Sequence, residues 1–151
     1  EIKSNKIYAS AIDVTERKNV EEKISKSEEL LRNMFENHSA VMLLIEPETG
    51  KILSSNNSAC DFYGYQKSEL ENMNISEINV LSKKDLEKYL KIATLNKRNY
   101  FERQHKLANG EIRTVEIHST PMIINGKNIL FSIIHDITDK KRNESELILA
   151  R

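Results

Sequence analysis

The sequence predicts an α+β domain in which helices cover an antiparallel sheet. Two observations carry this prediction. The order of predicted elements is helix, two strands, several helices, three strands and helix, and turn signals such as Asn109-Gly110 join neighbouring strands as hairpins. The last strand, residues 127–137, has Ile, Leu and Phe on both faces, which is typical of a central, covered strand.

Composition limits the class of protein. The 151 residues hold 23 Lys and Arg against 23 Asp and Glu, so no bulk charge favours nucleic acid or an anionic membrane. No apolar run approaches the ~20 residues that cross a bilayer, and no signal peptide precedes the domain. We expect a cytoplasmic chain without direct membrane insertion, whose parent could still be tethered to a membrane. The single cysteine excludes an internal disulfide.

A repeated motif predicts the domain boundaries. Asp13-Val-Thr-Glu-Arg-Lys18 aligns without gaps to Asp136-Ile-Thr-Asp-Lys-Lys141, about one domain length later. In both places Asp and Thr, residues whose oxygens accept the free N–H groups of a helix start, follow a β-rich run. We therefore expect four segments: the terminal strand of a preceding repeat over 1–15, a connector helix over 16–37, a complete domain over 38–138, and the start of the next connector helix over 139–151.

The connector helix carries a seam with spacings of 4, 3, 4 and 3, formed by Val20, Ile24, Ser27, Leu31 and Met34 and apolar except at Ser27. This spacing is heptad-like over about two heptads. Two interpretations stay open at this point. The helix packs on its own sheet, or it forms a homodimer through the seam.

The middle of the chain predicts one hairpin followed by short helices. Pro47 and Gly50 suit a turn between two strands, Gly64 suits a left-handed helix end, and Ser82 resembles the start of a capping box. The expected elements are strands 41–45 and 51–55, a short helix 59–63, single turns at 68–71 and 75–78, and an amphipathic helix 83–97.

Three longer strands follow, over 99–107, 111–120 and 127–137. Asn109-Gly110 and Asn125-Gly126 are hairpin turns. Pro121 ends the second of these strands or lies at a sheet edge, because proline cannot donate to a ladder.

The stretch from about Ser27 to Lys141 resembles a PAS domain. The matching pieces, in order, are Glu46 to Asn56, Ala59 to Tyr65, Ser68-Glu-Leu70, Asn109-Gly-Glu111, Pro121, Gly126 and Asp136-Ile-Thr138. The resemblance implies a five-stranded antiparallel sheet of order 2-1-5-4-3 whose helices close a small pocket. It also implies a sensory or interaction module of a multidomain signalling protein, commonly a histidine kinase. One departure is Val80-Leu-Ser-Lys-Lys-Asp85, where many relatives have a His-Pro-Asp-like segment.

The sequence argues against the coloured cofactors of this family. Cys60 lies in Ser58-Ala-Cys-Asp-Phe-Tyr63 and not in the Asn-Cys-Arg-Phe-Leu-Gln motif of flavin-binding light sensors. The helix 83–97 has no histidine where haem-binding members place their iron ligand. We therefore expect neither haem nor flavin and assign no other cofactor. Cys60 is interpreted as a buried structural cysteine.

The four histidines show no metal-pair spacing. His105 and His118 are solvated strand positions, or they face each other across the Asn109-Gly110 hairpin. His135 is interpreted as a partly buried strand residue, so a phosphoacceptor role is not expected. No nucleophile triad, phosphate loop or zinc motif is found, and we expect no catalysis by this chain.

Two functions remain open: a module that senses a small molecule or relays a signal, and a ligand-free dimerisation or structural module. Inward-facing polar residues would favour a ligand, and the candidates are Arg103, Gln104, Arg113 and His118. The candidate pocket consists of Phe62, Tyr63, Phe101, Arg103, Val115 and Ile117. The candidate relay consists of Asp136, Ile137 and Thr138, with Asp13 and Thr15 in the upstream copy. Expected partners are a small molecule, a second copy of the chain, and adjacent PAS or kinase domains.

Overall fold

A computed structural model describes residues 2–150, with the backbone alone for residues 2–9. The chain divides into two compact units, residues 1–35 and residues 36–151. The first unit is helical and the second contains the sheet. None of the helices within the described range is both long and apolar enough to cross a membrane.

Helix α1 spans Ile2–Glu36, and this corrects the prediction of a strand over residues 1–15. Residues 2–15 are helical, and Glu1 lies outside the described residues. A strand needs a neighbour to bond its backbone, whereas a helix bonds its own. Thr15 Oγ1 donates to the Ala11 carbonyl at 2.9 Å. Asp13 and Thr15 therefore lie inside a helix and form no strand exit in this chain.

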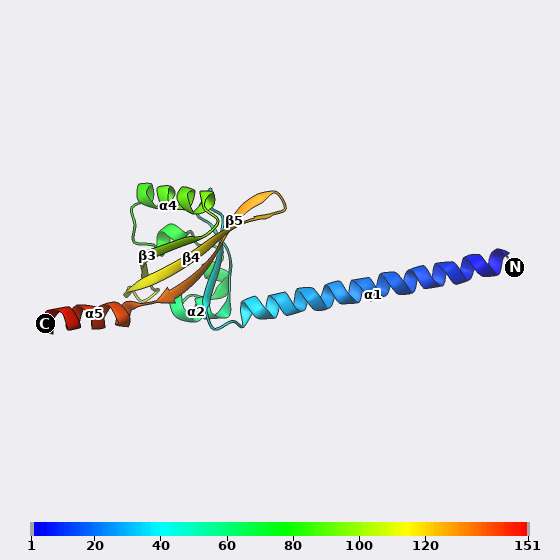
Figure 1. The fold of residues 1–151 in the computed structure, drawn as a ribbon, viewed down its shortest axis with the longest axis horizontal. Helices are drawn as coiled ribbons and strands as arrows, with labels where there is room; N and C mark the ends of the chain where they lie inside the picture. Colours follow the sequence, from blue (N-terminus) through cyan, green and yellow to red (C-terminus); the bar gives the residue numbers. More distant parts are fainter. Residues whose placement is uncertain (1, 151) are drawn as a thin grey trace. The chain divides into compact units, whose positions relative to one another are not determined.

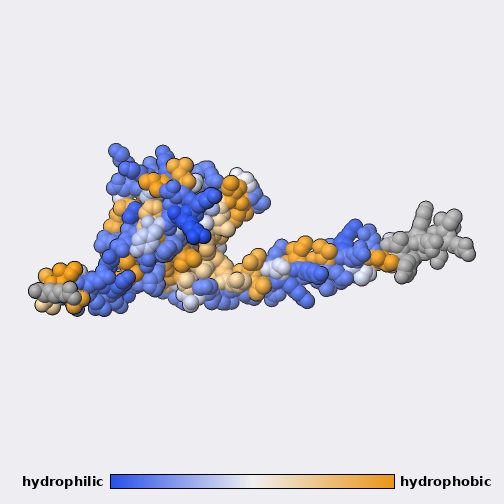
Figure 2. All heavy atoms as spheres, viewed as in Figure 1, coloured by the Kyte–Doolittle hydropathy of each residue, from blue (hydrophilic) through white to orange (hydrophobic). Residues whose placement is uncertain are grey.

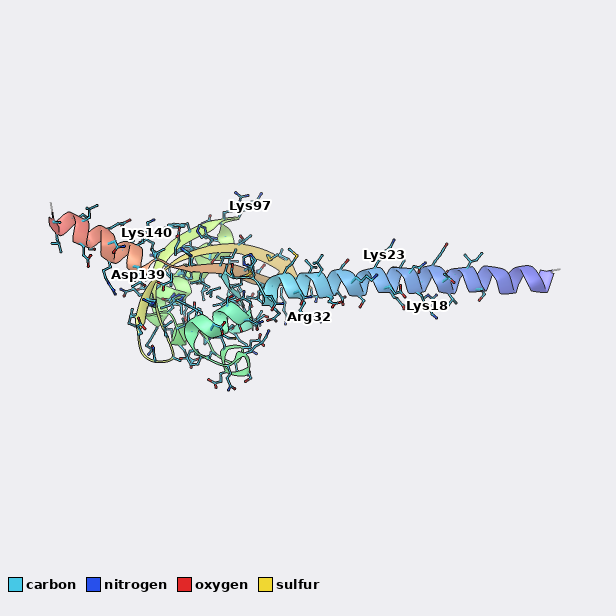
Figure 3. The ribbon with its side chains drawn as sticks, turned by 90° about the horizontal axis from the view of Figure 1, so that it is seen from below. Lys18, Lys23, Arg32, Lys97, Asp139 and Lys140 are labelled. Atoms are coloured by element: carbon cyan, nitrogen blue, oxygen red, sulfur yellow. The ribbon has the colours of Figure 1, made fainter. Side chains whose placement is uncertain are left out.

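The apolar seam of α1 is exposed. Val20, Ile24, Leu31 and Met34 are each more than half exposed, and apolar atoms are visible along the helix in Figure 2. Lys18, Lys23 and Arg32 extend outward from the helix (Figure 3). A helix with this apolar stripe has surface available for a partner helix, and dimerisation through it stays a prediction.

The second unit holds a five-stranded antiparallel sheet of order β2-β1-β5-β4-β3 (Figure 1). This confirms the α+β fold and the strand order that the PAS resemblance implied. Residue alternation places most of the buried side chains on one face of the sheet, although the adjacent residues Met42 and Leu43 of β1 are both buried. The strands are β1 Val41–Ile45, β2 Ile52–Ser55, β3 Asn99–Lys106, β4 Ile112–Ile124 and β5 Lys127–Asp136.

The helices between β2 and β3 begin and end at the polar and glycine residues that favour those positions. Asn56 accepts the Ala59 N–H at the start of α2, and Gly64 ends α2 with φ +82°. Ser82 accepts the Asp85 N–H at the start of α4, but the reciprocal capping box lies at Asn74 instead. These helices are α2 Asn57–Tyr63, α3 Lys67–Leu70, η1 Ile75–Glu77 and α4 Lys83–Leu95, and a last helix, α5 Thr138–Ala150, follows β5.

The core lies between the inner sheet face and the helices that join β2 to β3. Leu43, Val115 and Leu130 from the sheet are buried with Tyr63 and Leu90 from the helices. β5 is central, as predicted, with β1 and β4 as neighbours. Its outer side chains, Ile129, Phe131 and Ile133, are only half-buried, so the prediction that both faces are covered is met only in part.

The β4–β5 hairpin extends beyond the rest of the sheet (Figure 1). β4 continues past Pro121 to Ile124, while pairing with β3 stops at Ser119. Pro121 therefore lies where β4 has β5 as its only strand neighbour, which confirms the edge interpretation. Asn125 and Gly126 form the turn with φ values of +51° and +76°, the left-handed pair that a type I′ turn requires.

Candidate functional site

The first candidate site is the exit from β5 into α5. Asp136 is the last residue of β5 and pairs with Val115 of β4. Ile137 follows and is 5% exposed, so its side chain holds the junction in the core. Helix α5 begins at Thr138. The strand therefore passes into the helix with a single intervening residue.

A hydrogen-bond network ties this exit to β4. Asp136 Oδ1 accepts the Thr138 backbone N–H at 3.0 Å and the Thr138 hydroxyl at 2.6 Å. Thr138 Oγ1 in turn accepts the Thr114 N–H at 2.8 Å, and the Ile137 N–H donates to the Thr114 carbonyl at 2.9 Å. Asp136 satisfies a free N–H of the first helical turn. Thr138 instead bonds the helix start to the neighbouring strand.

Ion pairs surround the same junction. Arg113 Nε lies 3.3 Å from Asp136 Oδ2, and Lys141 Nζ of α5 lies 3.3 Å from Glu102 Oε2 of β3. These side chains are 27–42% exposed, so each pair contributes at most about 1 kcal/mol. The first pair joins β4 to β5, and the second joins α5 to β3. Arg113 was predicted as an inward residue for a ligand, and its charge is directed to Asp136 instead.

The second candidate site is a small cavity on the inner face of the sheet. Its volume is about 10 Å³, counted as the space open to the centre of a water molecule. Its wall is mostly apolar, with Asn79, His105 and Ser132 as the polar members besides the Tyr89 ring. The lining residues are Leu43, Ile45, Ile75, Asn79, Tyr89, Leu90, His105, Ile117, Leu130, Ser132 and Ile134.

His105 is the central polar residue at this cavity, and its burial corrects the expectation of a solvated position. It is 1% exposed, and its Nδ1 lies 2.9 Å from the Tyr63 hydroxyl. Burial lowers the pKa of His105 to about 4 and raises the pKa of Tyr63. Both groups are neutral at physiological pH.

The other histidines do not join this site. His118 pairs with Tyr100 and not with His105, so the alternative of a contact across the hairpin is wrong. The outward face of the sheet leaves His118 exposed, as the solvated interpretation predicted. His135 is exposed rather than partly buried, because strand alternation turns it away from the core. The His38 ring accepts the Ala40 N–H at 3.0 Å.

The predicted pocket residues divide into two groups. Ile117 lines the cavity. Tyr63 does not line it, but its hydroxyl forms a hydrogen bond with His105, which does. Phe101 and Arg103 instead pack against Tyr89. The ring centroids of Phe101 and Tyr89 are 4.4 Å apart, and the Arg103 guanidinium lies 5.1 Å from the centroid of the Tyr89 ring. Phe62 and Val115 contact the core outside the cavity.

Sequence reasoning missed His105 and Asn79 as cavity residues. The signal for His105 was available, because it shares the strand parity of Phe101 and Arg103 and all three point to the inner face. Asn79 lies in an irregular segment, where no periodicity predicts direction. An isolated β-bridge pairs it with His105.

A metal role and a reactive thiol receive no support. Within residues 2–150, no group of three or more His, Cys, Asp or Glu is placed to hold a metal ion. Cys60 is half-buried rather than fully buried, with its Sγ 3.9 Å from Ser55 Oγ. This neighbour is a neutral hydroxyl, and a cation is what would activate a thiolate.

Comparison with known proteins decides the family. The sequence profile of the PAS domain matches residues 38–139, about two thirds of the chain. The chain belongs to the PAS domain family. The fold agrees, since this PAS domain superimposes on the PAS domain of an HTR-like protein from Haloarcula marismortui with a TM-score of 0.73 at 24% identity, covering 80% of this chain and 99% of that one.

Curated relatives of this PAS domain are signalling proteins. Diguanylate cyclase DgcM of Escherichia coli is 34% identical over 124 residues, which are 81% of this chain and 30% of the relative. Sporulation kinase E of Bacillus subtilis is 27% identical over 139 residues, or 89% of this chain and 18% of the relative. The chain thus spans less than a third of either relative. A PAS domain of a two-component sensor histidine kinase has a TM-score of 0.66 at 16% identity, covering 74% of this chain and 97% of that one.

Proposed function

We propose that this PAS domain senses a small molecule, or relays a conformational signal, and passes the change through β5 and Asp136-Ile137-Thr138 to α5. The observation that carries the proposal is the network at the exit. The Thr138 side chain bonds both Asp136 of β5 and Thr114 of β4, so a movement of either strand changes the helix start.

The energy of the helix cap at Asp136 sets how much the helix population of α5 can change. A side-chain cap is worth roughly 0.5–2 kcal/mol, which alters a helix population several-fold without unfolding the domain. A ligand biases the helix only through its different affinity for the two states of the exit. The described part of α5 has no buried side chain, so little packing competes with the cap in setting its stability.

The domains next to this one define the wider proposal. The relatives carry cyclase or kinase in their names, and we infer an output enzyme of that kind in the parent, with a histidine kinase as our first choice. A further PAS domain upstream accounts for the repeated Asp13-Val14-Thr15 motif. A cytoplasmic location goes with this proposal, because such outputs use cytoplasmic nucleotides.

The decisive test changes the exit in the full-length parent. Asp136→Ala combined with Thr138→Ala should uncouple the output activity from the stimulus, while the PAS domain keeps its fold. Lys140→Ala is the matched control, because Lys140 is exposed and lies just beyond the network (Figure 3). A normal response of the double variant, or failure of the domain to fold, would show that the exit is ordinary structure.

A ligand-free dimerisation module is the second candidate function, favoured by the exposed seam of α1. A second copy of this chain would bury Val20, Ile24, Leu31 and Met34 against the same residues. This alternative and the sensory function are compatible, since a dimer of connector helices can carry the relayed signal.

A further inference from the structure

Two buried side chains bring unpaired hydrogen-bond donors to one cavity. His105 is 1% exposed and Asn79 is 4% exposed, and both line it. Among the residues that the structure describes, none accepts a hydrogen bond from His105 Nε2 or Asn79 Nδ2. A buried donor left unpaired costs about 1–3 kcal/mol. Two such donors at one small space indicate a common acceptor.

The Tyr63 hydroxyl decides which nitrogen of His105 carries the hydrogen. If Tyr63 donates to Nδ1 across the 2.9 Å contact, the hydroxyl hydrogen is satisfied and the neutral ring holds its hydrogen on Nε2. If Nδ1 donates instead, the hydroxyl hydrogen and the Nε2 lone pair are both left without partners. The first arrangement leaves fewer unpaired groups, and it makes Nε2–H a donor.

The orientation of Asn79 is set in the same way. Its Oδ1 accepts the Leu81 backbone N–H at 3.1 Å, which leaves the Nδ2 amide group as the free end of the side chain. Two hydroxyl groups belong to the lining: that of Ser132 is already paired with Ser119 at 2.8 Å, and that of Tyr89 is on the ring that packs against Phe101. The cavity therefore presents two neutral donors within an apolar wall.

A larger groove lies on the other side of one wall. It measures about 1030 Å³ and runs between α4, η1 and the β1–β2 turn. Leu90 lines both the groove and the cavity. In η1 and the residue before it, Ile75 lines the cavity while Asn74 and Ser76 line the groove. Leu90 and Ile75 thus separate the donors from an open space that admits a small organic molecule.

We propose that the cavity binds one uncharged oxygen acceptor between His105 Nε2–H and Asn79 Nδ2–H, either a water molecule or the carbonyl oxygen of a small ligand that enters from the groove past Leu90. The cavity volume fits a single oxygen, since one water needs about 10–15 Å³ of such space. A carboxylate is disfavoured, because two neutral donors do not repay the loss of its hydration. The inference rests on the sensory function and names the chemical class of its ligand.

The first experiment reads the donors directly by NMR of the ¹⁵N-labelled chain. We expect the ring nitrogen shifts of His105 to show hydrogen on Nε2, and cross-relaxation between this hydrogen and a long-lived water. Hydrogen on Nδ1 would overturn the proposal, because Nε2 would then need a donor. If neither side chain has a bound water, water is not the acceptor.

The second experiment tests the organic source with two probes of matched shape, acetamide and acetate. In Leu90→Ala, which opens the wall, acetamide should displace the water and shift the His105 and Asn79 side-chain signals saturably. We expect a preference over acetate on the order of tenfold, or about 1.4 kcal/mol, because two neutral donors do not repay the hydration that the carboxylate loses. Equal binding of acetate would overturn the choice of an uncharged acceptor. No response to acetamide would overturn the ligand and leave water as the only acceptor.

Two further variants separate the donors from the cavity itself. Asn79→Asp keeps the acceptor for Leu81 but replaces the donor, so the acetamide response should disappear. Ser132→Ala changes the same wall without touching either donor, and the response should persist. Loss of the response in both variants would contradict the donor assignment. None of these readouts involves α5, so the relay can fail while this site stands.

Discussion

The Tyr63–His105 pair is the clearest case of one side chain setting the state of another. Tyr63 is fully buried on α2 and reaches across the core to β3. Burial keeps the His105 ring neutral, because a charge would be costly in this apolar environment, and the Tyr63 hydroxyl pairs with its Nδ1. His105 thereby serves both packing and the donor set of the cavity.

This burial makes the stability of the domain depend on pH. The pKa of folded His105 is lowered to about 4 by loss of hydration, while the unfolded value is about 6.5. As pH falls from 6.5 toward 4, the unfolded chain binds the proton and the folded domain does not, so the free energy of unfolding decreases by roughly 3 kcal/mol. Urea unfolding at a series of pH values measures this slope.

Matched variants isolate that slope. His105→Phe keeps an aromatic ring, and it should lose the dependence between pH 4 and 6.5 despite a lower stability at neutral pH. Ser132→Ala changes the same cavity wall without removing a titratable group, so it should leave the slope unchanged. The account fails if His105→Phe keeps the slope of the native chain.

Two turn glycines differ in how strictly their positions exclude a side chain. Gly50 and Gly126 both have positive φ, at +79° and +76°. A Cβ added at Gly50 would lie 2.7 Å from Asn74 Oδ1, whereas nothing lies within 4 Å of one at Gly126. Asn74 holds the start of η1 through its bonds to Ser76 N–H and to the Thr49 carbonyl.

We therefore expect Gly50→Ala to destabilise the domain more than Gly126→Ala. Both changes cost about 1–2 kcal/mol for the left-handed backbone. Gly50→Ala should cost roughly 1–3 kcal/mol more, because Asn74 must shift and its hydrogen bonds weaken. Chemical denaturation of the two variants gives the difference directly. Equal losses would show that Asn74 yields without cost.

The sheet and its hairpins were predictable because their signals are local. Asn125-Gly126 needs only two residues to favour its turn, and alternation along β4 places Val115 and Ile117 inward. The order of the strands came from the family resemblance. The cavity was less predictable, since Asn79 is brought to His105 by a non-local bridge and no period predicts it.

Residues 2–15 show that a local signal can also predict the wrong element. The alternation of Ile7, Ala9 and Ala11 predicted a strand, yet α1 includes them. The five described strands are β1 to β5 and do not include this segment, because the strongly helical residues that follow extend upstream. The repeated motif around Asp13 can still mark a preceding domain in the parent, which stays a prediction.

For the molecule as a whole, the exposed seam predicts a dimer. At tens of micromolar, sedimentation should show a dimer that Ile24→Glu converts to a monomer, since a charge in the seam meets its own copy. Ser25→Glu adds the same charge one position off the seam and should remain dimeric. A monomeric native chain would remove the dimerisation proposal.

The chain by itself should carry out no catalysis. The PAS domain family is a sensory class, and we assign the output enzyme to other parts of the parent. The purified 151-residue chain should therefore show no ATP hydrolysis and no autophosphorylation above a buffer control. Turnover that copurifies with the chain through several columns would contradict this.

The central claim is that the exit of β5 sets the stability of α5, and backbone chemical shifts measure it most directly. In the 151-residue chain, Asp136→Ala combined with Thr138→Ala should lower the helix population over residues 139–150 several-fold and leave the signals of β1 to β5 in place. Asp136→Asn retains an oxygen acceptor and should stay close to the native helix population. An unchanged α5 in the double variant, or loss of the sheet together with the helix, would contradict the claim.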